Sequence, residues 1–202
     1  MKRLGLLLAV LALAVLAGCS GGESDESDSS TNAPAVVGSG QPVPAENNPP
    51  GDIPDNIAFV DYTNPAGRYT FKHPEGWAET TNASTVNFTD KLNGVTAMTG
   101  PATAPPTVDS AQSQDVPALK TSQDAFELRK VTAVKVAAGQ GVRIVYRRNS
   151  AADPVTGKQY RDEVERYEIV ANGREVIVEL YGPVGADNVD AYQTMISSLR
   201  LT

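Results

Sequence analysis

Aromatic residues are confined to one part of this chain. Its seven Tyr, four Phe and single Trp all lie at or after Phe59. Large aromatic side chains supply much of the area that a hydrophobic core can bury. The stretch 57–202 is long enough for one domain that buries about two thirds of its unfolded surface, and no fixed-period repeat interrupts it. We therefore predict a single globular domain over 57–202.

The preceding segment has the opposite composition. Residues 20–56 contain six Ser, five Gly, six Pro and seven acidic residues, with no Lys, Arg or aromatic residue. Such a segment cannot bury enough apolar surface to offset the loss of chain entropy. We therefore predict that 19–56 forms a disordered acidic tether that begins at Cys19.

The tether also explains most of the acidity of the chain. The formal net charge is −7, and a protein that binds nucleic acid needs a basic face to neutralise phosphate. We therefore expect no nucleic-acid partner. Because the seven acidic residues of the tether account for this charge, the pI of about 4.7 is no evidence for a cationic ligand of the domain.

The first residues resemble a bacterial lipoprotein leader. Lys2 and Arg3 precede an uncharged stretch over 4–17, and Leu16-Ala17-Gly18-Cys19 follows the pattern of a lipobox. That stretch is shorter than the roughly 20 apolar residues that span a membrane, and it fits the core of a signal peptide. We expect residues 1–18 to be removed as a signal peptide.

Cys19 is the single cysteine of the chain, so an intramolecular disulfide is excluded. By analogy with lipoproteins, the Cys19 thiol would carry a diacylglyceryl group and anchor the protein to the extracytoplasmic face of the cell membrane. Two or more acyl chains give stable anchoring where one does not. An ordinary signal peptide that happens to end near a cysteine is the alternative.

The clearest local signal in the domain is Asn172-Gly173 between two alternating runs. This dipeptide favours a two-residue type I′ hairpin turn. The turn sets the pairing of the two strands, so we predict Ile169 opposite Val176, Tyr167 opposite Val178 and Arg166 opposite Glu179. Further alternating stretches predict strands near 69–72, 84–89, 94–100, 130–137 and 142–147.

Two segments have helical periodicity, 115–128 and 187–199. Together with the strands they predict an α+β fold: a mostly antiparallel β-sheet of six or more strands with helices packed on it.

A nine-residue stretch of this domain resembles a known family. Tyr69-Thr70-Phe71-Lys72-His73-Pro74-Glu75-Gly76-Trp77 is similar to the F-x-x-P-x-G-W opening of PsbP/Mog1-like domains, which also end on an element like Ser198-Leu199-Arg200. The domain also resembles that of secreted actinobacterial lipoproteins of the LpqN/LpqT type. The resemblance implies α/β/α layering and a binding role without catalysis.

The candidate residues for catalysis or metal binding are few. His73 is the single histidine, so neither the usual zinc ligand set nor a Ser-His-Asp arrangement has support. The carboxylates Asp162, Glu163 and Glu165 alternate with Arg161 and Arg166, which is typical of a solvated strand face. We read Gly139-Gln140-Gly141 as a turn. We expect no enzyme, no cofactor and no metal.

Arg143 and Arg147 are the candidate recognition residues. With Lys130, Lys135 and Arg148 they form the only concentrated basic cluster of the domain, and such a cluster suits an anionic group. Neutralisation by acidic residues of a neighbouring strand is the alternative.

The sequence favours a non-catalytic recognition domain that an envelope lipoprotein presents to a protein partner. The alternative is a carrier or sensor of a small amphipathic or anionic envelope ligand, such as a lipid. A cavity of at least about 300 Å³ would favour the ligand carrier, and a filled interior with an exposed apolar patch would favour the protein partner.

Overall fold

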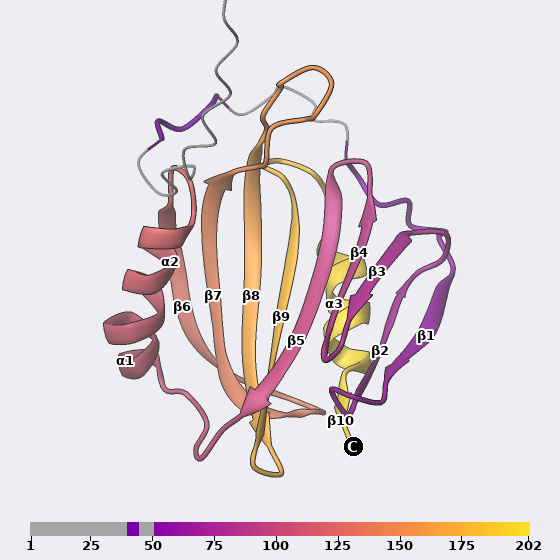
Figure 1. Ribbon diagram of the computed structural model, residues 1–202, viewed down its shortest axis with the longest axis vertical. Helices are drawn as coiled ribbons and strands as arrows, with labels where there is room; N and C mark the ends of the chain where they lie inside the picture. The colour runs from indigo at the N-terminus through magenta and orange to yellow at the C-terminus, as the bar shows by residue number, and fades with distance from the viewer. Residues whose placement is uncertain (1–39, 45–50) are drawn as a thin grey trace, which may run out of the picture. The chain divides into compact units, whose positions relative to one another are not determined.

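The computed structural model describes residues 40–44 and 51–202, and Figure 1 shows its helices and strands. The strands are β1 (Phe59–Asn64), β2 (Tyr69–Pro74), β3 (Ala78–Asn82), β4 (Thr85–Asp90), β5 (Asn93–Pro101), β6 (Glu127–Val136), β7 (Gly139–Asn149), β8 (Arg161–Ala171), β9 (Arg174–Pro183) and β10 (Arg200–Leu201). The helices are α1 (Val108–Ser110), α2 (Val116–Ser122) and α3 (Val189–Ser198), and a π-helical segment over Ala111–Asp115 joins α1 to α2.

The strands form two antiparallel sheets. The larger sheet has seven strands in the order β3-β4-β5-β9-β8-β7-β6, and the smaller has the order β1-β2-β10. Most neighbouring strands of the larger sheet follow one another in the chain and are joined by short hairpins. The pair β5 and β9 is the exception, because β9 lies between β5 and β8 (Figure 1). The predicted α+β fold with a mostly antiparallel sheet is confirmed.

The hairpin at Asn172-Gly173 has the predicted register. Arg166 lies opposite Glu179, Tyr167 opposite Val178 and Ile169 opposite Val176. Both turn residues have positive φ, 55° for Asn172 and 72° for Gly173, as a type I′ turn requires.

The predicted helix over 115–128 is wrong at both ends. Helical structure begins at Val108 and ends at Ser122, and β6 already begins at Glu127. Thr107 caps the first turn through a reciprocal pair of bonds with Ser110. Pro117 lies near the start of α2 and cannot supply a backbone N–H. The π-helical segment immediately before it widens the turn, and the N–H of Val116 donates to the carbonyl of Ala111.

Two hydrophobic clusters lie on opposite faces of the large sheet. One lies between the sheet, the small sheet and α3. It includes Tyr69, Phe71, Phe88, Leu180 and Met195, all of which are buried. The other lies beneath α1, the π-helical segment and α2. It includes Leu119, Ile144, Tyr146 and Val164. The side chains of β7 and β8 therefore alternate between two covered faces.

The packed domain begins before residue 57, so the predicted boundary of the tether is wrong. Ile53 is buried in the larger cluster, and its N–H donates to Oδ1 of Asn188 at 2.7 Å. The carbonyl of Gly51 accepts from Nδ2 of Asn93 at 2.7 Å. In 40–44, the N–H of Val43 donates to Asn149 at 3.0 Å. The buried side chain of Ile53 and hydrogen bonds with side-chain amides hold these residues against the domain, although the segment is polar on average.

Candidate functional site

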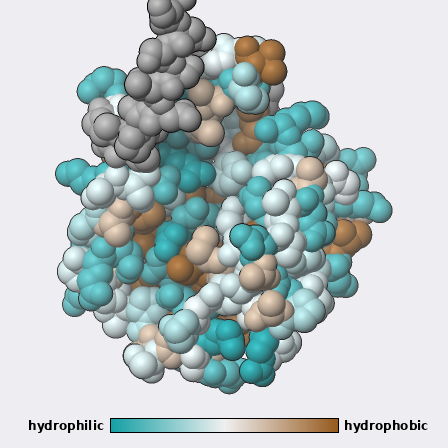
Figure 2. All heavy atoms as spheres, viewed as in Figure 1, coloured by the Kyte–Doolittle hydropathy of each residue, from teal (hydrophilic) through white to brown (hydrophobic). Residues whose placement is uncertain are grey.

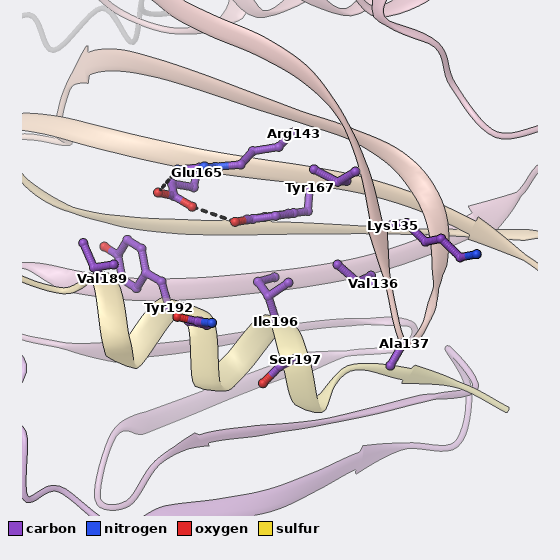
Figure 3. A pocket seen from close by; sticks show the side chains of 12 residues that line it. Lys135, Val136, Ala137, Arg143, Glu165, Tyr167, Val189, Tyr192, Ile196 and Ser197 are labelled. Atoms are coloured by element: carbon purple, nitrogen blue, oxygen red, sulfur yellow. Dashed lines mark hydrogen bonds and ion pairs between the residues drawn. The ribbon is translucent and has the colours of Figure 1, made fainter.

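A groove lies between α3 and the strands β6, β7 and β8. Its volume is about 530 Å³. The groove exists because α3 packs on the central strands and on β2, through buried side chains such as Tyr192, Met195 and Ile196, and does not cover the β6 end of this face. Figure 3 shows α3 along one side of the groove and the strands along the other. The lining residues are Val134, Lys135, Val136, Ala137, Arg143, Glu165, Tyr167, Val189, Tyr192, Gln193, Ile196 and Ser197.

One wall of the groove is a connected polar set. Nη2 of Arg143 donates to Oε1 of Glu165, and Oη of Tyr167 donates to Oε2 of the same carboxylate at 2.8 Å. Arg143 and Tyr167 are direct partners in the β7–β8 ladder, and the guanidinium lies 5.8 Å from the centre of the Tyr167 ring. Burial, together with the charge of Glu165, raises the pKa of Tyr167. Tyr167 is therefore a neutral hydrogen-bonding group at physiological pH.

The guanidinium of Arg143 is only partly satisfied by groups of 40–44 and 51–202. Among the described residues its buried Nε has no hydrogen-bond partner, and its ion pair with Glu165 uses Nη2. About a third of the side chain is exposed in the groove (35%). A guanidinium has five N–H donors, so Arg143 can bind a further acceptor while it keeps Glu165.

The rest of the groove is largely apolar. Val134 and Val136 of β6 face Tyr192 and Ile196 of α3 across it, and Val189 lies at the rim with 68% of its surface exposed. A cavity with an apolar body and a polar wall suits a ligand that itself has an apolar part and a polar part.

The structure separates the two predicted recognition residues. Arg143 lines the groove, whereas Arg147 pairs with Glu163 on β8, Nε to Oε2 at 3.0 Å, and does not line it. Both arginines are thus paired with acidic residues of the neighbouring strand, and recognition by Arg143 or Arg147 stays a prediction. Within the same cluster, Lys135 lines the groove, while Arg148 pairs with Asp162.

The prediction of a solvated strand face at 161–168 is wrong for Arg161 and Asp162, whereas the side chain of Glu163 is 43% exposed. Arg161, Asp162 and Glu168 are 5%, 2% and 2% exposed. The stretch lies beside α1 and α2, which cover one face of the large sheet. Arg166 pairs with Glu168 at 2.6 Å and with Glu179 at 2.8 Å. Sequence alternation gives the face of each side chain but cannot reveal that both faces are covered.

His73 is buried rather than at a surface rim. It is 9% exposed, and its ring stacks on Phe88 with centroids 3.7 Å apart. Nδ1 lies 2.9 Å from the carbonyl of Pro74. Burial lowers the pKa of His73 below its usual range, so the ring acts as a neutral stacking partner in the core.

Other features bear on the predicted membrane anchor and on metals. Cys19 lies outside the described residues. Over 40–44 and 51–202 no helix is long and apolar enough to cross a membrane. The same residues contain no group of three or more His, Cys, Asp or Glu side chains placed to hold a metal ion.

No family model and no curated protein matches this chain. Solved structures similar to it include the Ran-binding protein Mog1p of Saccharomyces cerevisiae, at 10% identity and a TM-score of 0.48, over 72% of this chain and 96% of that chain. Cyanobacterial PsbP from Synechocystis is 13% identical over 75% and 98%, with a TM-score of 0.47. LpqN, involved in cell envelope biogenesis of Mycobacterium tuberculosis, is 12% identical over 73% and 86%, with a TM-score of 0.43. Membership of the PsbP/Mog1-like family remains a prediction.

Proposed function

We propose that this protein is a non-catalytic binding module that takes a small amphipathic ligand in the groove beside α3. In this proposal an acylated Cys19 holds the module at the extracytoplasmic face of the cell membrane. The observation that carries the proposal is the groove itself. Its volume of about 530 Å³ lies within the range of roughly 300–1,000 Å³ that is usual for small-molecule sites.

The surface of the described domain supports a ligand rather than a protein partner. The large hydrophobic residues exposed in this part of the chain are Leu128, Val155 and Val189. They lie on β6, on the loop after β7 and on α3, so they form no continuous patch of the kind that marks a protein interface. On the face seen in Figure 2, hydrophobic atoms are scattered among hydrophilic ones.

The groove also explains the polarity expected of the ligand. Val134, Val136 and Ile196 offer an apolar surface, and Arg143 offers hydrogen-bond donors elsewhere in the same lining. A ligand with an acyl or other apolar body and an acceptor-bearing head would satisfy both. The non-catalytic role in this proposal is based on the contacts of Glu165. Both Arg143 and Tyr167 donate hydrogen bonds to its carboxylate, so that carboxylate is engaged within the protein.

A dansyl-labelled undecanoic acid tests the proposal, because its fluorescence rises when the label enters an apolar site. Gln193 lines the groove and is exposed, so Gln193→Trp should fill the groove without disturbing the core. We expect saturable binding by the native protein and a loss of at least about tenfold in affinity in Gln193→Trp. The matched control is Ala118→Trp on the exposed side of α2, which should bind normally. Equal binding by all three proteins would overturn the proposal.

A further inference from the structure

The short segment 40–44 is bound to the domain through its backbone. Figure 1 shows it at the end of the large sheet where α2 and β7 end. The side chain of Asn149 contacts the segment twice. The N–H of Val43 donates to Oδ1 at 3.0 Å, and Nδ2 donates to the carbonyl of Gln41 at 2.8 Å. One carboxamide thus pairs with a donor and an acceptor of the same peptide, as a neighbouring strand would.

The contacts of Asn149 within the domain hold this carboxamide in place. Asn149 is the last residue of β7 and is 5% exposed. Its Nδ2 also donates to Oδ2 of Asp124 at 2.9 Å, and its backbone N–H donates to the carbonyl of Asp124 at 2.9 Å. The other carboxylate oxygen, Oδ1 of Asp124, accepts from the N–H of Gly40 at 2.8 Å. Because the two side chains are already fixed, little conformational entropy is lost when a peptide binds.

Two prolines prepare the segment for these contacts. Gln41 and Val43 each precede a proline, which disfavours helical backbone and favours an extended one. Pro42 and Pro44 have no backbone N–H, so between them Val43 supplies the only donor, and Asn149 accepts it. Gln41 and both prolines are exposed, whereas Val43 is half-buried. The recognised groups therefore belong to the main chain, which other extended peptides share.

We infer that Asn149 and Asp124 form a binding site for an extended peptide, and that 40–44 fills this site as an intramolecular ligand. If 40–44 left, the carboxamide of Asn149 would lose two of its partners, and unmet hydrogen bonds of a buried group are costly. An extended segment of a partner protein, with one N–H between two prolines, would restore both bonds and would compete with 40–44. The site is separate from the groove beside α3, since neither Asn149 nor Asp124 lines that groove.

The first test releases the segment without a change in the site. In the full chain, kept in a zwitterionic detergent, Val43→Pro removes the N–H that Asn149 accepts and lies outside both hydrophobic clusters. Val43→Ala is the matched control, because it keeps this N–H. NMR of the side-chain NH₂ group of Asn149 reports on the site. We expect its signal to move in Val43→Pro and to stay close to the native position in Val43→Ala.

The second test supplies the ligand as a separate molecule. A synthetic peptide with the sequence of 39–46 is titrated into each protein. We expect saturable shifts of the Asn149 signal in Val43→Pro. Binding by the native chain and by Val43→Ala should be at least about tenfold weaker, because their own segment occupies the site at a high effective concentration.

A change in the peptide alone gives a comparison that a folding defect cannot produce. The same peptide carrying Val43→Pro lacks the recognised N–H, so it should bind the Val43→Pro chain at least about fivefold more weakly than the unchanged peptide. Equal binding of the two peptides, equal binding by the native chain and Val43→Pro, or no saturable shift in Val43→Pro would overturn the inference. An Asn149 signal at the same position in all three proteins would also overturn it.

Discussion

Arg166 lies directly opposite Glu179 in the β8–β9 ladder, and its Nη1 donates to Oε1 of that residue at 2.8 Å. The Arg166 side chain is 16% exposed and that of Glu179 is 12% exposed. A second carboxylate, Glu168, accepts from Nε at 2.6 Å. One arginine thus compensates two acidic residues on a covered face of the sheet.

Loss of Arg166 should destabilise the domain strongly. Arg166→Met would leave Glu168 and Glu179 without their partner in a desolvated setting, and such uncompensated charge costs about 3–5 kcal/mol. Urea unfolding of the two proteins measures the difference. The control is Lys72→Met, which breaks an exposed pair with Asp61 and should cost at most about 1 kcal/mol. Similar losses in both variants would contradict the buried role of Arg166.

Asp162 should make the stability of the domain depend on pH. Burial raises the pKa of Asp162 to about 7 although Arg148 and Arg161 oppose the shift, whereas in the unfolded chain it is near 4. A raised pKa in the folded state means that the unfolded chain loses its proton first. The contribution of Asp162 to the free energy of unfolding, up to about 4 kcal/mol, is therefore fully present below pH 4 and is lost as the pH rises through 7.

Asp162→Asn should remove that dependence. Between pH 5 and pH 9 we expect the free energy of unfolding to change less in the variant than in the native protein. The two changes should differ by on the order of a few kcal/mol. Chemical unfolding at each pH measures this. Parallel pH profiles for the two proteins would show that Asp162 is ionised alike in both states.

Ile53 should contribute to stability although it precedes the predicted domain. Ile53→Ala removes a side chain that is 5% exposed, and truncation of a buried Ile costs about 2–5 kcal/mol. Val155→Ala, at a position 90% exposed, should change little. A shift of the thermal midpoint in the first variant and not in the second would show that 51–56 packs as part of the domain.

Gly141 is required where two strands approach closely. A Cβ at this position would clash with the carbonyl oxygen of Glu168, which belongs to the backbone of β8 and cannot turn away. Gly141→Ala should therefore separate β7 from β8 and lower the thermal midpoint by several degrees, about the effect of 1–3 kcal/mol. Gly100→Ala on β5, with no atom within 4 Å of the new Cβ, should be tolerated.

Local chemistry explains which parts of this structure the sequence predicts. Asn172 and Gly173 determine a turn by themselves, so the register of β8 and β9 follows from two adjacent residues. The start of the helical region at Val108 depends on Thr107 and Ser110, whose capping pair precedes the apolar periodicity that predicts a helix from 115.

The site depends on contacts that sequence alone does not give. The groove brings together Arg143 of β7 and Tyr192 of α3, and nothing near either residue in the chain indicates the other. For the same reason the sequence does not distinguish Arg143 from Arg147 as a recognition residue. Of the two, only Arg143 lines the groove. Burial of Asp162 and Glu168 likewise follows from the position of the helices over β7 and β8, which residue alternation cannot predict.

The two arginines should therefore differ in ligand binding. Arg143→Gln removes the guanidinium from the groove wall, and the affinity for an amphipathic acid should fall about fivefold to tenfold, as for a lost charge-assisted hydrogen bond. Arg147→Gln should leave it unchanged, because Arg147 lies outside the groove and pairs with Glu163. Fluorescence titration of both variants measures the affinities, and equal losses would contradict the assignment.

Methyl NMR of the native protein, titrated with unlabelled undecanoic acid, tests the central claim most directly. The methyl groups of Val134, Val136, Val189 and Ile196 line the groove, whereas those of Ile144 and Val164 lie beneath α1 and α2 on the other face of the sheet. The account predicts saturable shifts in the first set and none in the second. Shifts confined to the second set, or no shifts in either, would contradict a ligand groove beside α3.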